Sequence, residues 1–475
     1  MKLLKRLCLV VTAVLAFTLL APLSASAIIF TPTNGKDENG NLVPVYFYSQ
    51  SIYMINTVTG EPIVDINGSE KLSPGYLTQL MTCALVLDKF SGNEKKLRDT
   101  HISADSEAFD ELYETGAPTA DIRPGEEVSY YDLLSAMILC SSCEAANIIA
   151  VNMADSIFDF TTKMNAKAKE LGMTDTNFAS PHGFFVMQNY STAKDMCVLC
   201  RYLVNNYPVF KDIARQEYLQ LEATDYHSEG TNIYNNNYMV TSYSDYYYSF
   251  ADGMKSSVQD GSGRSLATYA SYEGNNYLAV SLNAPIEKTA SDVKKGEQDP
   301  DSIYGQDYVY YSMLDHKALY DWAFYSIVST DFINPNSEIT DAKVEYGDEA
   351  DYVNLKPAGG CSMLWPVGIP ITEVSQKVTV FDNIIAPVEK GDVLGKMELI
   401  YQGEVLSSID LIATSGVKRS KTAAELKIAS AFYRSSEFKW AIFMIIMVFT
   451  VYSVVFFIFQ QLKYLKINNK KDKKE

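Results

Sequence analysis

The sequence is short of basic residues. It has 40 Lys and Arg against 58 Asp and Glu, which gives a formal net charge of −18. The first 27 residues carry +3 and the tail from Lys463 carries +4, so the segment between them carries −25. A surface this acidic binds nucleic acid poorly, and we therefore expect no nucleic-acid partner. The sequence also lacks an internal repeat of solenoid period, which argues against a stacked repeat architecture.

Histidine and cysteine are scarce as well, with four and seven residues. Cys8 lies near the N-terminus, and the other six include two C-x-x-C pairs, Cys140–Cys143 and Cys197–Cys200. Such pairs are one pattern of zinc sites. Here they lie in or beside apolar stretches of helical length and lack the glycines of a zinc knuckle. We therefore interpret them as small buried side chains or as one local disulfide, and we expect no metal and no cofactor.

Two long hydrophobic runs lie at the ends of the chain. Near the N-terminus, Lys2, Lys5 and Arg6 precede the apolar run 7–20, and Ala25-Ser26-Ala27 has the small residues of a cleavage site. This pattern predicts a signal peptide over 1–27, with an uncleaved anchor as the alternative.

The second run, Trp440–Phe459, has no charged residue and is about 20 residues long, enough to cross a bilayer as a helix. We predict a transmembrane helix over 439–460, a juxtamembrane linker helix over 421–438 and a basic cytoplasmic tail over 461–475. The main body then lies outside the cell membrane. A buried core helix is the alternative, and the basic tail argues against it.

The hydrophobic pattern between these runs changes once. From 28 to 330, apolar stretches of helical length alternate with strand-like stretches, which predicts an α+β domain with helices near 77–90, 128–153, 158–171, 192–205 and 308–328. From 331 to 420, short alternating runs separated by Gly, Pro and Asp predict a small β-rich domain. The charged stretch 287–305 is predicted to be an exposed insertion.

Seven ordered segments of the chain carry a family resemblance: Tyr53–Val64, Asp121–Gly125, Val128–Leu134, Met173–Phe178, Ser180–Gly183, Tyr190–Asp195 and Ala251–Lys255. Together they resemble the serine-type D-alanyl-D-alanine carboxypeptidases, the low-molecular-mass penicillin-binding proteins. The resemblance covers about 45–330 and, more weakly, the β-rich domain to about 417. It implies a penicillin-binding/β-lactamase-like domain (an antiparallel sheet with helices), followed by a small all-β domain and one C-terminal transmembrane helix.

Members of this family act through S-x-x-K, S-x-N and K-T-G motifs. In the first motif a lysine accepts the proton of a serine that begins a buried helix, and the serine attacks the peptide carbonyl. Here the matching turn is Pro74-Gly75-Tyr76, so Tyr76 stands at the nucleophile position and Gln79 at the base position. A phenol has an ordinary pKa of about 10, and an amide cannot act as a base near neutral pH.

The other two motifs are partly kept. The second is Ser141-Ser142-Cys143, in which Cys143 replaces the asparagine that would hold the substrate amide. The third is Lys255-Ser256-Ser257, in which Ser257 replaces a glycine that lets the ligand backbone approach closely. Lys255, Ser256 and Ser141 are the candidate substrate-binding residues, because they keep a cation and two hydroxyls.

Each of these residues also has a simpler interpretation. Ser141 could cap the following helix, and Lys255 could pair with an acidic neighbour. Tyr76 could fill the substrate pocket that the resemblance implies, or its ring could stack against a glycan or peptide. His182 is predicted to lie in a structural loop. The other S-x-x-K strings do not begin a buried helix after a turn, and we assign none as the nucleophile: Ser191–Lys194, Ser291–Lys294, Ser415–Lys418 and Ser436–Lys439.

Two functions remain open. The first is a catalytically inactive family member that acts as a membrane-anchored binding or scaffold protein, with a peptidoglycan stem peptide or a cell-wall protein as partner. The alternative is an active serine-type carboxypeptidase that trims peptidoglycan stem peptides and still uses Ser141 and Lys255. The joint loss of serine, lysine and asparagine favours the first.

Overall fold

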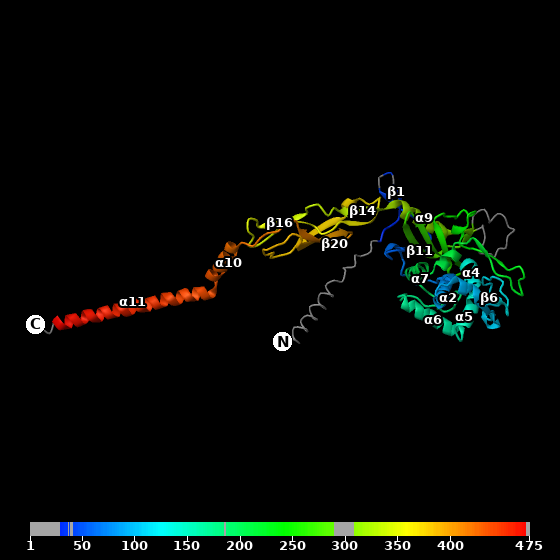
Figure 1. The fold of residues 1–475 in the computed structure, drawn as a ribbon, viewed down its shortest axis with the longest axis horizontal. Helices are drawn as coiled ribbons and strands as arrows, with labels where there is room; N and C mark the ends of the chain where they lie inside the picture. The colour runs from blue at the N-terminus through cyan, green and yellow to red at the C-terminus, as the bar shows by residue number, and fades with distance from the viewer. Residues whose placement is uncertain (1–28, 37, 39–40, 185–186, 289–307, 472–475) are drawn as a thin grey trace. The chain divides into compact units, whose positions relative to one another are not determined.

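The computed structural model describes residues 29–36, 38, 41–184, 187–288 and 308–471. The chain divides into two compact units (Figure 1). One comprises Ser26–Ser329 with Leu364–Pro370, and the other includes Thr330–Met363 and Ile371–Glu475. The predicted signal peptide, the end of the predicted cytoplasmic tail and most of the predicted charged insertion lie outside the described residues.

The first unit is built on a five-stranded antiparallel sheet. Its strands lie in the order β4-β3-β11-β10-β9, so the N-terminal hairpin completes a sheet whose other strands come about 200 residues later. Period-2 alternation directs successive side chains of β11 to opposite faces. Tyr277 and Ser281 contact α9, whereas Leu278 and Val280 belong to the core that includes α2 and α7. The strands are β3 Ser51–Asn56, β4 Pro62–Ile66, β9 Ala251–Gln259, β10 Gly263–Tyr272 and β11 Asn275–Ala284.

Helices therefore cover both faces of this sheet. The 3-10 turn η1, Gly75–Thr78, leads directly into α2, whose side chains are buried on most sides. Serine or threonine side chains cap several of the helices by accepting a backbone N–H, as Thr192 does for α7. The helices are α2 Gln79–Phe90, α3 Glu94–Asp99, α4 Tyr130–Cys140, α5 Cys143–Met153, α6 Ile157–Glu170, α7 Ala193–Asn206, α8 Pro208–Ala214 and α9 Tyr311–Ser326.

Short two-stranded sheets and turns complete this unit. The paired strands are β1 Thr33–Lys36 with β2 Leu42–Pro44, β5 His101–Ser103 with β6 Glu127–Ser129, β7 Tyr218–Gln220 with β8 Asn232–Tyr234, and β12 Glu287–Lys288 with β13 Tyr308–Val309. The remaining 3-10 turns here are η2 Ser106–Phe109 and η3 Tyr238–Val240.

The second unit contains a five-stranded antiparallel sheet in the order β15-β16-β20-β19-β18. Its strands are β15 Thr340–Lys343, β16 Tyr352–Pro357, β18 Ser375–Val380, β19 Val393–Tyr401 and β20 Glu404–Ala413. The strands β14 Ile327–Ile333 and β17 Cys361–Pro366 each include residues of both units. The chain ends in α10, Lys421–Arg434, and α11, Ser436–Lys471. Within α11, Ser436–Lys463 is long and apolar enough to cross a membrane.

Candidate functional site

The turn that begins α2 is packed tightly against β9. Gly75 has a φ of +54°, and a Cβ at this residue would lie 2.5 Å from Ser257 Oγ. The same Oγ accepts a hydrogen bond of 2.9 Å from the backbone N–H of Tyr76. Tyr76 itself is only 3% exposed. The side chain of Ser257, at the predicted glycine position, is thus occupied in holding the Tyr76 turn in place.

Gln79 lies one turn further along and joins α2 to the connection between α4 and α5. Its Nε2 donates to the carbonyls of Ser141, at 3.0 Å, and Ser142, at 3.4 Å. The side chain is fully buried, and its Oε1 has no hydrogen-bond partner among the described residues. An ammonium at this position would be a charge that burial penalises, whereas the amide is neutral. Gln79 is therefore a structural link between two elements.

The α4–α5 connection positions Ser141 and Cys143. Ser141 ends α4 with a φ of +63°, and Ser142, not Ser141, caps α5 by accepting from the N–H of Ala145 at 3.1 Å. The expectation that Ser141 caps this helix is therefore wrong, because its left-handed backbone turns its own hydroxyl toward β9. Cys143 is fully buried at the start of α5, and burial raises the pKa of its thiol well above the ordinary value.

Lys255 on β9 completes the cluster. Its Nζ donates to Ser141 Oγ at 3.0 Å and to the Met137 carbonyl, and the side chain is fully buried. Burial lowers the pKa of Lys255 to about 8. No carboxylate of the described residues forms an ion pair with it, so the predicted pairing with an acidic neighbour is wrong. Among the described residues, the Lys255 ammonium is hydrogen-bonded to two neutral groups, the Met137 carbonyl and the Ser141 hydroxyl.

The Ser141 hydroxyl is fully used in this arrangement. It accepts from Lys255 Nζ and from Asn236 Nδ2, the latter at 3.1 Å, and it donates to the carbonyl of Ser256 at 3.5 Å. One donor and two acceptor positions are what a hydroxyl has. Sequence reasoning missed Asn236, which lies in an Asn-rich run that has no motif around it.

The structure thus brings all the predicted site positions together, from η1 and α2, the α4–α5 connection and β9. Every one of them is buried: Tyr76, Gln79, Ser141, Cys143, Lys255, Ser256 and Ser257. In the described part of the chain, these side chains form one buried and largely polar cluster.

The Ser180–Gly183 segment supports this cluster from the other side. A Cβ at Gly183 would lie 2.1 Å from the carbonyl oxygen of Gly75, so only glycine fits there. Thr82 donates to the Pro181 carbonyl at 2.7 Å. His182 is buried and lies 2.9 Å from Glu111 through Nε2, while its Nδ1 accepts from the N–H of Phe184. These contacts agree with a structural role for His182.

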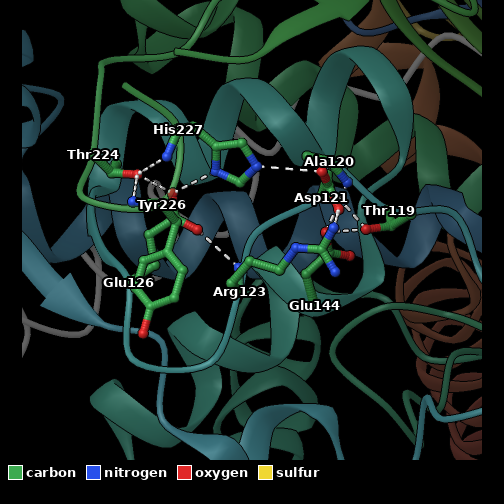
Figure 2. Close-up of polar contacts among 9 residues, drawn as sticks. All are labelled: Thr119, Ala120, Asp121, Arg123, Glu126, Glu144, Thr224, Tyr226 and His227. Carbon is green, nitrogen blue, oxygen red and sulfur yellow. Dashed lines mark hydrogen bonds and ion pairs between the residues drawn. The ribbon is translucent and has the colours of Figure 1, made fainter. Parts of the chain in front are cut away.

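The Asp121–Gly125 segment is tied to the start of α5 by a second polar network (Figure 2). Glu144 accepts from Thr119 Oγ1 at 2.6 Å and from the N–H of Ala120 at 2.7 Å, and burial raises the pKa of its carboxyl. On the other side of the segment, His227 lies 3.1 Å from Glu126 and 3.2 Å from Asp121. The segment is therefore held at both ends.

The six cysteines of the described chain are all free, so the alternative of one local disulfide does not apply to them. Cys83, Cys143, Cys197 and Cys200 are buried, which agrees with their interpretation as small interior side chains. No group of three or more His, Cys, Asp or Glu side chains in the described part of the chain is arranged to hold a metal ion.

Comparison with known proteins identifies the family. Residues 41–286 match the family described as D-alanyl-D-alanine carboxypeptidase, and residues 329–419 match the penicillin-binding protein 5, C-terminal domain. The first match spans more than half of the chain, so the protein belongs to the D-alanyl-D-alanine carboxypeptidase family, a family of cell-wall metabolism.

Individual relatives are distant but similar over most of their length. D-alanyl-D-alanine carboxypeptidase DacF of Bacillus subtilis is 25% identical over 80% of this chain and 88% of its own. DacC of Escherichia coli is 24% identical over 84% and 91%. The crystal structure of DacD from Francisella tularensis has a TM-score of 0.57 at 20% identity and covers 83% of this chain and 97% of its own. The expected α+β penicillin-binding/β-lactamase-like fold, with a small all-β domain and an apolar C-terminal helix, is confirmed.

Proposed function

We propose that this protein is a catalytically inactive member of its family. In this proposal α11 anchors it in the membrane with the main body outside, where it acts as a binding or scaffold protein for a peptidoglycan stem peptide or a cell-wall protein. The observation that carries the proposal is the pair Tyr76 and Gln79, which stand where the family has its nucleophile and base.

The chemistry of the family needs an accessible nucleophile and a group that takes its proton. Gln79 offers no titratable group, and its amide N–H bonds point to backbone carbonyls. Tyr76 is buried, and Ser257 fills the space that a glycine would leave for a ligand. Cys143 offers only a weak donor where an asparagine would bind the substrate amide. Each replacement removes a different part of the reaction.

One observation favours the alternative, an active serine-type carboxypeptidase. Lys255 Nζ lies 3.0 Å from Ser141 Oγ, and its pKa of about 8 leaves a neutral fraction that could accept the serine proton. Against it, the side chains of Ser141 and Lys255 are both fully buried, whereas a nucleophile has to be accessible to its substrate.

The first prediction separates the two functions. We incubate the full chain in detergent with a fluorescent penicillin and with a peptide that ends in D-Ala-D-Ala, and we expect neither a covalent label nor released alanine. Stable acylation, or alanine release that disappears in Ser141→Ala, would contradict inactivity.

Binding is measured separately. The unmodified protein and Lys255→Ala, each in detergent, are titrated with the same peptide and followed by NMR. Absence of binding in both would leave a cell-wall protein as the partner.

A further inference from the structure

A cavity of about 550 Å³ lies along α7, and none of the positions of the three motifs lines it. Its volume is within the range of roughly 300–1,000 Å³ that is usual for small-molecule sites. Its walls are one face of α7, the β3 strand with the turn that follows it, and Leu171 at the end of α6.

The α7 wall is continuous because its residues recur at helical spacing. Lys194, Val198, Arg201 and Asn205 follow one another at intervals of four, three and four, which places them on one side of the helix. This wall has both charged and apolar side chains. Lys194 and Arg201 are its cations, Val198 lies between them, and the amide of Asn205 follows. Across the cavity, Ile55 adds a buried apolar surface.

Arg201 is held in place by the backbone. Its Nε donates to the Thr57 carbonyl and its Nη2 to the Val58 carbonyl, each at 3.0 Å. The guanidinium has five N–H donors, so three are left beyond these two bonds. A Cβ at Gly60 would lie 2.5 Å from Arg201 Nη1, and the φ of +78° at Gly60 also favours glycine. The turn thus leaves room for a fixed guanidinium at the cavity.

Lys194 is exposed at the other end of this wall. Among the described residues, neither Lys194 nor Arg201 forms an ion pair with a carboxylate, and no Asp or Glu lines the cavity. In a chain with a net charge of −18, a concave surface with two unpaired cations and no acid is a local exception. Such a site favours a negatively charged ligand.

We propose that this cavity binds a small organic anion. Its carboxylate or phosphate group would pair with the fixed guanidinium of Arg201, Lys194 would add the second positive charge of the wall, and its apolar body would pack on Ile55, Val198 and Leu171. The inference does not depend on whether the protein is inactive, because it concerns residues outside the three motifs.

The experiment follows the methyl groups that line the cavity. The full chain in detergent, labelled with ¹³C in its Ile, Leu and Val methyl groups, is titrated with phenyl phosphate, benzoate and the neutral benzyl alcohol. We expect either anion to shift the Ile55, Leu171 and Val198 resonances saturably, and benzyl alcohol to leave them in place. The tighter of the two anions identifies the preferred head group.

Lys194→Met removes one cation from an exposed position without a described side-chain partner, so the fold is expected to persist. It should weaken the anion about fivefold, which is the effect of a charge pair worth about 1 kcal/mol. Lys96→Met, at an exposed lysine on α3, is the matched control and should change nothing. Equal binding of benzyl alcohol, no shift with any probe, or an unchanged affinity in Lys194→Met would each overturn the proposal.

Discussion

Tyr76 and Gln79, at the proposed nucleophile and base positions, are both held by hydrogen bonds to other parts of the fold. The Tyr76 backbone is bonded to Ser257, and the Gln79 amide is bonded to the carbonyls of the α4–α5 connection. Because the third-motif serine and the first-motif turn contact each other directly, their effects on stability and on any activity should be coupled. Restoring one motif alone therefore does not restore the geometry of the other.

The second prediction follows from this coupling. Tyr76→Ser combined with Gln79→Lys should not restore full alanine release, because Cys143 and Ser257 still stand at the proposed positions of the substrate contacts. The release assay with the D-Ala-D-Ala peptide measures it, and a fourfold variant that adds Cys143→Asn and Ser257→Gly is the comparison. Full recovery in the double variant would show that these two positions matter less than proposed.

The third prediction concerns the buried ammonium of Lys255. Its pKa is about 8 in the folded chain and 10.5 as an ordinary value, so the folded state binds fewer protons between these two pH values. The free energy of unfolding should therefore rise between about pH 8 and pH 10.5, by at most about 3 kcal/mol. Below about pH 8 the cost of burying the charged Lys255 side chain should be constant. Denaturant titrations in detergent measure the free energy of unfolding at each pH for the unmodified protein and for Lys255→Met, which has no titratable group at this position. Parallel pH profiles would contradict the assignment.

At the scale of elements, His227 connects the loop between β7 and β8 to the Asp121–Gly125 segment (Figure 2). Hydrogen bonds to Glu126 and Asp121 raise the pKa of His227, and Arg123 forms an ion pair with the same Asp121. The two carboxylates favour the protonated ring, so the contribution of His227 to stability is greatest when it is charged.

The fourth prediction is the pH dependence of this connection. A raised pKa means that the stabilisation is complete below about pH 6.5 and is lost as the pH rises through the folded-state value. His227→Gln should thus cost more stability at about pH 5.5 than at about pH 9. The cost should not exceed about 1 kcal/mol, because the ring keeps contact with solvent. Thermal melts of both proteins measure it, and a larger cost at high pH would contradict it.

The elements were predictable where local pattern decides them. The stretches 128–153 and 192–205 have helical periodicity, and the structure has α4, α5 and α7 there. Residues 45–55 have strand-like alternation, but β3 begins only at Ser51, because the N–H groups of Tyr48 and Ser49 donate to Asp315, a residue more than 260 positions away. A sequence pattern does not reveal such a partner.

The same limit applies to the site. The motif positions stay predictions from the family resemblance, and the structure brings these residues together in one cluster. The contacts that occupy them were not predictable. Asn236 and the Met137 carbonyl reach Ser141 and Lys255 through tertiary packing, and the capping role moved to Ser142 because of the left-handed backbone at Ser141.

At the scale of the whole molecule, α11 is a candidate membrane-spanning helix. Its apolar stretch Ser436–Lys463 predicts an integral membrane protein. The fifth prediction is that the full chain stays in the membrane fraction after alkaline carbonate extraction, whereas a chain that ends at Ser435 is released. A chain that lacks only 464–475 is the control and should remain bound. Release of the full chain would contradict the span.

The free cysteines have a consequence for how the protein matures. Since none of the six in the described chain is cross-linked, the folded state draws no stability from covalent links between distant segments. Folding then needs no thiol oxidant in the compartment that receives the chain. The fold should form equally well under anaerobic and aerated growth, and reducing agents should leave its melting temperature unchanged.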